Sequence, residues 1–319
     1  MPAITAALRD KDSRNTMIMK IVPFLGLLFL ILFFQIVTKG NLLSFKNLRL
    51  IFNQGYSLFI AALAGVFVIS TGNLDFSMGG IIGFSCVCAT LAATKINPVF
   101  AVPAALLVGT LMGTVNGFAQ TILKLPSFIA CLCMMFILMA GTQSLITGSS
   151  IMMPIVMMKW ETTTMKLIVL AIYAAVMVVM FRFTKLGKEL KTLGVSWEAA
   201  RQSGVSPRVR IFQAYTLSGF AAGVTGFFLM LRTGGAAIST GSTMTTDVIV
   251  AIVFGGMAIS GGASSKITAA MLGTLIVTIL NNGMVLAGYG GDAQQLVKGL
   301  LFLVIISIST SRDPNVIIK

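Results

Sequence analysis

The residues that could do catalytic or metal chemistry are few in this chain and badly spaced for it. There is no histidine, and most of the nine acidic residues lie at the ends of apolar runs. The four cysteines form two C-x-C pairs, Cys86 with Cys88 and Cys131 with Cys133. Residues two apart on a helix point to opposite sides of it, so neither pair alone can hold a metal. With no phosphate-binding G-x-x-x-x-G-K-[ST] loop either, we expect packing cysteines and no catalytic residue, metal or cofactor in this chain.

The composition is that of a membrane protein. Hydrophobic residues make up 56% of the 319 residues and charged residues only 10%, with a mean hydropathy of +0.96. Soluble domains carry about 25% charged residues. The net charge of +14 could suggest nucleic acid, but the basic residues are scattered in short connections. We therefore predict an integral membrane protein in contact with lipid, with no nucleic-acid partner.

Apolar runs long enough to cross a bilayer as helices, about 17–22 residues each, recur along the whole chain. We predict an all-α, polytopic transmembrane bundle of about ten spans that forms a single domain over 1–319. Residues 1–19 would form a cytoplasmic tail and 184–209 a cytoplasmic loop. Most Lys and Arg residues then lie on the inner side if both termini are inside, which predicts an N-in, C-in topology. The predicted spans are roughly 20–38, 52–72, 78–95, 98–120, 127–147, 166–183, 210–231, 246–261, 266–286 and 295–311.

Glycines repeat every four residues within several of these runs, which places them on one face of a helix. Small residues on one face let two helix backbones approach closely in a membrane. We predict that these faces are helix contacts in a tightly packed bundle. The repeats are Gly79 with Gly83, Gly109 with Gly113 and Gly117, and Gly219 with Gly223.

Polar residues interrupt the apolar runs at two places, in "GNLDFSMGG" at 72–80 and in the pair at 281–282. Irregular backbone at membrane depth needs protein or water around it. The first stretch is therefore either a polar turn held by backbone hydrogen bonds or part of a solute pathway, and the second is either hydrogen-bonding glue between helices or a solute contact. The candidate pathway residues are Asn73, Asp75, Phe76, Ser77, Asn281 and Asn282.

Ionisable residues that could couple transport to an ion gradient are scarce. The candidates are Asp75, Asp247 and Lys298, and each lies close to the end of an apolar run. Ion-driven carriers usually hold such residues within the membrane. An ion-coupled carrier or channel therefore stays an alternative, weakened by the lack of a chain of acidic residues across the membrane.

One stretch, "TLGVSWEAARQSGVSPRVR" from Thr192 to Arg210, is amphipathic and charged. Ser196 can cap the N-terminus of a short helix and Gly204 can end it. Trp197 and Arg201 fall one turn apart. A helix of about two turns is marginal in isolation, so it is either stabilised by a partner or merely part of a solvated loop.

The same stretch resembles a known family. "EAARQSG" at 198–204 is similar to the E-A-A-x-x-x-G motif of bacterial ATP-binding-cassette importer permeases, and "KLGKELKTLGVSWEAARQSGV" resembles the ribose, galactose and xylose type. Two further blocks agree in order and spacing, "STGNLDFSMGGIIG" at 70–83 and the run from 246 to 288 that includes "VFGGMAISGG" and "LNNG". With the ending "QQLVKGLLFLVII", the resemblance covers roughly 50–310.

The resemblance implies a multi-pass permease subunit in the bacterial plasma (inner) membrane that carries a sugar or sugar-like solute inward. It implies no ATPase of its own, since a separate cytoplasmic ATPase subunit would bind MgATP. The other expected partners are an extracytoplasmic solute-binding protein and a second permease copy, in a homodimer or a heterodimer with a related permease. The residues expected to couple to the ATPase are Glu198, Ala199, Ala200, Arg201 and Gly204. An importer permease for a nucleoside or another small polar solute, such as a branched-chain amino acid, is a further alternative.

Overall fold

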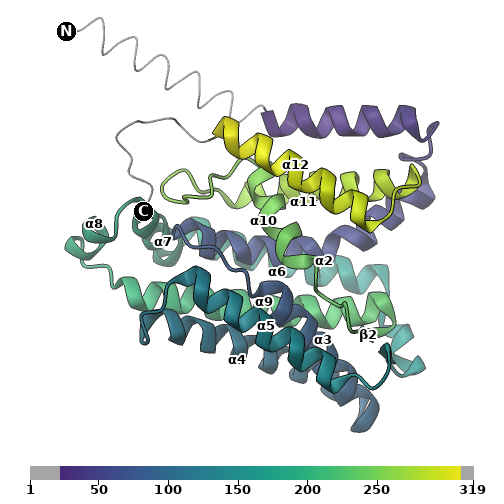
Figure 1. Cartoon of the computed structure of the whole chain (residues 1–319), viewed down its shortest axis with the longest axis horizontal. Helices are drawn as coiled ribbons and strands as arrows, with labels where there is room; N and C mark the ends of the chain where they lie inside the picture. The colour runs from purple at the N-terminus through teal and green to yellow at the C-terminus, as the bar shows by residue number, and fades with distance from the viewer. Residues whose placement is uncertain (1–21, 310–319) are drawn as a thin grey trace, which may run out of the picture.

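The computed structural model describes residues 22–309, and the predicted tail at 1–19 lies outside that range. Most helices run roughly along one common axis, with α7 and α8 at one end of the bundle and β2 toward the other (Figure 1). A helix over Val22–Val37 precedes α2. The labelled helices are α2 (Phe45–Ser70), α3 (Met78–Lys95), α4 (Ala101–Thr121), α5 (Ser127–Leu145), α6 (Thr163–Phe183), α7 (Lys185–Val195), α8 (Trp197–Gln202), α9 (Pro207–Thr233), α10 (Met244–Phe254), α11 (Ile267–Leu286) and α12 (Gly291–Ser309), with the 3-10 helices η1 (Pro98–Phe100) and η2 (Ile155–Trp160).

Seven of the described helices are long and apolar enough to cross a membrane: α2, α3, α4 with η1, α5, α6, α9 and α11. The helix over Val22–Val37 and α10 are apolar but shorter. Each of the ten predicted spans overlaps one helix of the structure. The protein is therefore a helical, multi-pass membrane bundle, whereas the count of ten spans and the side of the termini stay predictions.

The predicted span over 246–261 is wrong in its second half. Helix α10 ends at Phe254, and the chain then follows an irregular path to α11. Gly256, Gly261 and Gly262 have φ angles of +90°, +67° and +83°, which side chains other than glycine rarely adopt. Hydropathy alone could not show this break because the residues remain apolar.

The structure also contains a short element that hydropathy did not predict. Strand β1 (Ser150–Met152) pairs with β2 (Gly235–Ala237) in an antiparallel ladder, with Ile151 opposite Ala236. The ladder joins the connection after α5 to the end of α9. Strand β2 lies toward the end of the bundle that is away from α8 (Figure 1).

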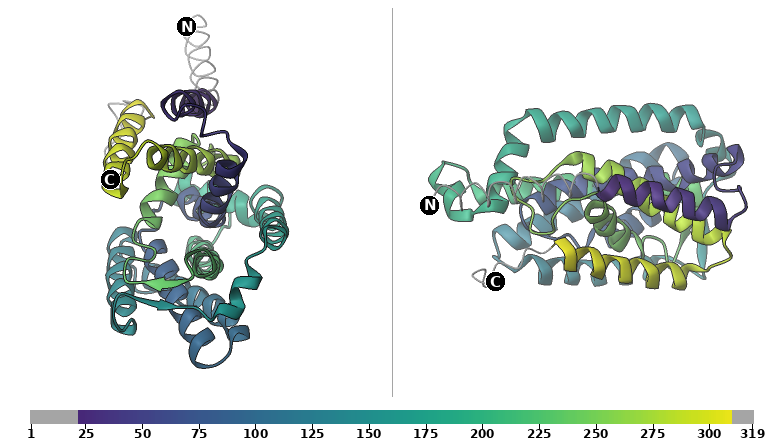
Figure 2. Two further views of the ribbon diagram at one scale, coloured as in Figure 1. Left: turned by 90° about the vertical axis from the view of Figure 1, so that its right-hand side faces the viewer. Right: turned by 90° about the horizontal axis from the view of Figure 1, so that it is seen from above.

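Helices α2 and α9 form the centre of the bundle, and α4, α5 and α6 lie around them. The most apolar windows of α2 and α9 are 72% and 78% buried, against 22% for α6. Figure 2 shows α6 along the outside of the bundle in both views. The exposed side chains of α6 are largely aliphatic and aromatic, as expected of a surface in contact with lipid.

The contact between α4 and α9 confirms two of the three predicted glycine faces, while Gly79 and Gly83 pack instead on the connection around Thr240 and Gly241. A Cβ atom on Gly109 would lie 2.6 Å from the carbonyl oxygen of Gly219, and one on Gly113 would lie 2.6 Å from the Cα atom of Gly219. Gly223 faces Gly109 from the next turn of α9. The two backbones touch directly here, as small residues permit in membrane helices.

Candidate functional site

Helices α7 and α8 form a hairpin at one end of the bundle (Figure 1). Leu190 and Leu193 of α7 are buried against the bundle. Glu189 of α7 forms an ion pair with Arg210 at the start of α9. The Nζ atom of Lys191 lies 4.6 Å from the ring centre of Phe181, in a cation–π contact. The hairpin is thus attached to the bundle by an apolar face and by charges.

The electrostatic surroundings of Lys191 differ from those of a freely exposed lysine. Partial burial against the bundle, and then the nearby positive charge of Arg182, lower the pKa of its ammonium group. Because folding lowers this pKa, the charged form of Lys191 costs folding free energy at neutral pH, and the cost is relieved as the pH rises through the lysine range.

The short helix predicted in the charged stretch is confirmed, with both of its ends. The Oγ atom of Ser196 accepts a hydrogen bond of 3.3 Å from the backbone N–H of Ala199, so Ser196 is the N-cap of α8. The chain leaves α8 at Gln202 and turns at Gly204, which has a φ angle of +79°. No atom would obstruct a Cβ on Gly204, so the φ angle alone favours glycine there.

Helix α8 presents an outward surface made of Trp197, Glu198, Ala199 and Arg201, which we call the α8 surface. Glu198 and Arg201 form an ion pair at 4.0 Å with side chains 74% and 75% exposed, and Trp197 is 50% exposed. Ala200 is completely buried and faces the bundle. Of the predicted coupling residues, Ala200 therefore anchors α8 to its own chain, while the others point outward.

Two of the predicted pathway residues, Asp75 and Ser77, belong to a hydrogen-bond network. One oxygen of the buried Asp75 carboxylate accepts from the backbone N–H and the hydroxyl of Ser77, at 3.0 and 2.5 Å. The other oxygen accepts from the hydroxyl of Ser218 at 2.7 Å. The amide of Asn116 donates to Ser77 Oγ at 2.9 Å. Tyr215 bonds the Ser127 hydroxyl at 2.7 Å and donates to the Leu74 carbonyl at 3.4 Å.

This Asp75 network, made of Asp75, Ser77, Asn116 and Ser218, ties the loop before α3 to α4 and α9, and Tyr215 of α9 holds the same loop through the Leu74 carbonyl. Both carboxylate oxygens of Asp75 already have partners. The arrangement agrees with a polar turn that holds the bundle together. Sequence reasoning missed the partners on α4 and α9, although Tyr215 and Ser218 are one turn apart in an otherwise apolar helix.

The other two residues of the loop do not share that network. Asn73 donates to Thr71 Oγ1 at 3.0 Å and lines a cavity of about 360 Å³ that Trp197 of α8 also lines. Phe76 packs edge to face on Phe128, with ring centres 5.4 Å apart. The four predicted residues of the loop thus have different surroundings, and their place in a solute pathway stays a prediction.

The neighbours Asn281 and Asn282, on α11, have opposite surroundings. Asn282 is buried, accepts a hydrogen bond of 2.9 Å from the amide of Asn47, and donates to Gln54 Oε1 at 3.5 Å. The Oδ1 atom of Asn281 is buried without a partner among the described residues. Asn282 thus joins α11 to α2, whereas Asn281 lines a cavity.

That cavity has a volume of about 330 Å³ and lies between α2, α9, α10, α11 and α12, and most of the residues that line it are polar. Asp247 and Lys298 form a buried ion pair in its wall. Arg232 donates to the backbone carbonyl of Gln54 at 3.1 Å. We call this cavity the polar chamber, defined by Gln54, Arg232, Asp247, Asn281, Gln295 and Lys298.

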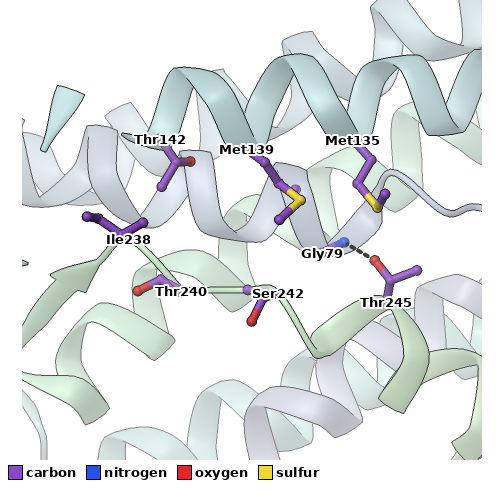
Figure 3. A pocket seen from close by; sticks show the side chains of 10 residues that line it. Gly79, Met135, Met139, Thr142, Ile238, Thr240, Ser242 and Thr245 are labelled. Carbon is purple, nitrogen blue, oxygen red and sulfur yellow. Dashed lines mark hydrogen bonds between the residues drawn. The ribbon is translucent and has the colours of Figure 1, made fainter. Parts of the chain in front are cut away.

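A third hollow lies between α3, α5 and the connection before α10 (Figure 3). Thr245 accepts a hydrogen bond of 2.8 Å there from the backbone N–H of Gly79. The hollow has only about 10 Å³, which is room for about one water molecule. It is a packing feature and has no space for a solute.

No group of three potential metal-ligating side chains occurs between residues 22 and 309. The four cysteines are unpaired: Cys86 and Cys131 are buried among helices, Cys88 is partly buried and Cys133 is exposed. Within the described range, the α8 surface is the candidate for binding a partner and the polar chamber is the candidate for binding a solute.

Comparison with known proteins places the chain among transport permeases. The family model described as "Branched-chain amino acid transport system / permease component" matches residues 47–306. The chain is 29% identical to the galactofuranose transporter permease protein YtfT of Escherichia coli, over 88% of this chain and 84% of that protein. It is 28% identical to the ribose import permease protein RbsC of Escherichia coli, over 69% of this chain and 72% of that protein.

A third relative is the fructose import permease protein FruF of Bifidobacterium longum, 28% identical over 60% of this chain. The chain spans 57% of the length of that protein. No solved structure matches the chain. The family match covers most of the described helices, from the start of α2 into α12. The chain belongs to the family of branched-chain amino acid transport system permease components.

Proposed function

We propose that this chain is the permease subunit of an ATP-binding-cassette importer that carries a sugar or sugar-like solute inward across the bacterial plasma membrane. The family match supports a permease, and relatives named for galactofuranose, ribose and fructose support a sugar-like solute. A separate cytoplasmic ATPase would bind MgATP and supply the energy. A solute-binding protein outside and a second permease copy would complete the importer.

The observation that carries this proposal is the α8 surface. A six-residue helix gains little stability by itself, yet α8 is capped, anchored through Ala200 and exposes Trp197 beside an ion pair. Exposed tryptophan and arginine are typical of protein interfaces. We expect the ATPase to bind this surface, which places the α8 end of the bundle in the cytoplasm and both termini inside.

The hairpin is well placed to pass a movement on to the bundle. Gly194, at the end of α7, packs directly against Gly262 and the carbonyl of Ser70. The N–H of Gly262 itself donates to the Ser70 carbonyl at 3.1 Å. A displacement of α8 by the ATPase would therefore reach the glycine-rich breaks after α2 and α10 first. Such a shift between two packings would change the side to which the pathway opens.

The test is co-expression of this chain with the ATP-binding-cassette ATPase encoded beside its gene. Glu198→Lys should reduce the ATPase that co-purifies with the permease, or uncouple ATP hydrolysis from uptake, because it places two positive charges together on α8. Lys159→Glu is the matched control, since Lys159 is an exposed residue near the other end of α6. Full ATP-driven uptake by the Glu198→Lys importer would contradict the role of α8.

The alternative of an ion-coupled carrier has a separate outcome. Vesicles that contain only this chain would then accumulate solute on a proton or sodium gradient without nucleotide. The carboxylate of Asp247 is paired with Lys298, so it would have to release the lysine before it could bind a cation. Gradient-driven accumulation by the permease alone would overturn the proposal.

A further inference from the structure

We infer that the polar chamber is a solute-binding site within the permease itself, and that it takes a neutral, polyhydroxylated solute. The inference rests on the proposed function and adds the place and chemistry of the site. At about 330 Å³ the chamber has the size of pockets that hold small molecules, which begin at about 300 Å³. Residues of five helices line it, and among them Asp247 and Lys298 are buried.

The first reason is unused hydrogen-bonding capacity. Asn281 Oδ1 and Thr278 Oγ1 are both buried without a partner among the described residues, and both residues line the chamber. They are three residues apart on α11, and therefore on one face of that helix. Most buried side-chain polar atoms in proteins have a hydrogen-bond partner. Of the six buried side-chain oxygens without one among the described residues, these two lie together in the wall of a cavity, where a bound solute could pair with both.

The second reason is the balance of charge in the wall. The carboxylate of Asp247 and the ammonium of Lys298 neutralise each other, so neither charge is free for a ligand. An amino-acid solute would bring a carboxylate and an ammonium group, and would need an unpaired charge of each sign. Arg232 supplies a cation that already donates to the carbonyl of Gln54, and the chamber has no free carboxylate to match it.

The remaining wall suits hydroxyl groups. The amides of Asn281, Gln54 and Gln295 can each donate and accept hydrogen bonds, as every hydroxyl group of a sugar does. Leu58 and Val285 add apolar patches beside them, which suit the C–H face of a sugar ring. A neutral sugar satisfies this mixture better than an aliphatic amino acid would.

The third reason is the position of the chamber along the bundle. Arg232 lies at the far end of α9, 25 residues from its beginning beside α8. Asp247 is on α10, and the break after α10 contains Gly262, which contacts Gly194 of the hairpin. A solute arriving from outside would thus meet the chamber before the middle of the bundle, beside a helix that is followed by a break in contact with the hairpin.

The experiment uses vesicles containing the whole importer, with the permease, its ATPase and its binding protein. ATP-driven uptake is measured for radiolabelled D-ribose, D-galactose and D-fructose, with D-galacturonate as the anionic probe. Asn281→Leu and Thr278→Val remove the unpaired polar groups with little change in volume. Thr274→Val is the control, one turn earlier on α11, where the buried hydroxyl already donates to the Ala270 carbonyl at 2.7 Å.

We expect Asn281→Leu to lower uptake at low solute concentration at least about tenfold, through a raised KM, and Thr278→Val to lower it less. Thr274→Val should transport like the wild type. Wild-type uptake by both chamber variants would overturn the site while leaving the importer intact. Loss of assembly with the ATPase in both would overturn it too, since the unpaired groups would then be structural. Preferred uptake of galacturonate would overturn the neutral class, and absence of any sugar uptake by the wild type would overturn the proposed function instead.

Discussion

The Asp75 network and the polar chamber both consist of polar side chains in apolar helices, the first between α3, α4 and α9 and the second between α2, α9, α10, α11 and α12. In the network, each carboxylate oxygen of Asp75 has a partner and α3, α4 and α9 are linked. In the chamber, Asn281 and Thr278 keep unpaired oxygens beside a cavity. Polar residues in this membrane protein therefore fall into two groups: those whose hydrogen bonds are made within the chain, and those that keep an unpaired oxygen beside a cavity.

Among these predictions, stability should fall most when the ion pair in the chamber wall is broken. Lys298→Met leaves the buried carboxylate of Asp247 alone and should destabilise the protein by about 3–5 kcal/mol. The thermal midpoint of the purified protein in detergent measures this loss. The double variant Lys298→Met with Asp247→Leu should recover most of it, because both charges are then absent. No recovery in the double variant would mean that these residues contribute through other contacts.

The next effect tests whether the Asp75 network is structural. Asp75→Leu keeps the approximate size but leaves the donors of Ser77 and Ser218 unpaired, which should cost about 3 kcal/mol. Asp292→Leu, an exposed residue of α12, should change the thermal midpoint very little. If Asp75→Leu were as stable as the wild type and lost only transport, Asp75 would belong to the pathway and the two regions would not differ as stated.

A smaller effect comes from the glycine contact that brings the network together. Gly113→Ala places a methyl group 2.6 Å from the Cα atom of Gly219 and pushes α4 away from α9, at a cost of about 2 kcal/mol. Asn116, one turn later on α4, would move with it. Gly299→Ala in α12 is the control, because no atom lies within 4 Å of the added methyl group. Equal thermal midpoints for the two variants would show that α4 and α9 do not pack this closely.

Much of the fold follows from the sequence, because long apolar runs must be helices in a membrane. Helix α8 was predictable with both ends, since Ser196 and Gly204 are caps with a local cause. The partners of Asp75 were not predictable, since Ser218 lies 143 residues along the chain and only the packing of α9 brings it near. The end of α10 was missed for a different reason. Its glycines break the helix without changing the hydropathy.

The sequence also could not show which of Asn281 and Asn282 keeps an unpaired side-chain oxygen. Asn281 and Asn282 are the same residue in adjacent positions, and nothing local separates glue from a solute contact. A helix turns by about 100° per residue, so the two side chains face different neighbours. Asn282 bonds Asn47 of α2, whereas Asn281 lines the chamber. Only the three-dimensional arrangement assigns the two roles.

The smallest change in stability is expected at Asn282, and the adjacent Asn281 serves as its control. Asn282→Leu leaves the buried amide of Asn47 without its partner on α11 and should cost about 1 kcal/mol, the scale of hydrogen bonds between membrane helices. Asn281→Leu breaks no hydrogen bond of the described chain, so its thermal midpoint should equal that of the wild type or exceed it slightly. A drop in Asn281→Leu as large as in Asn282→Leu would show that both residues hold the fold. The chamber would then be no different from the Asp75 network.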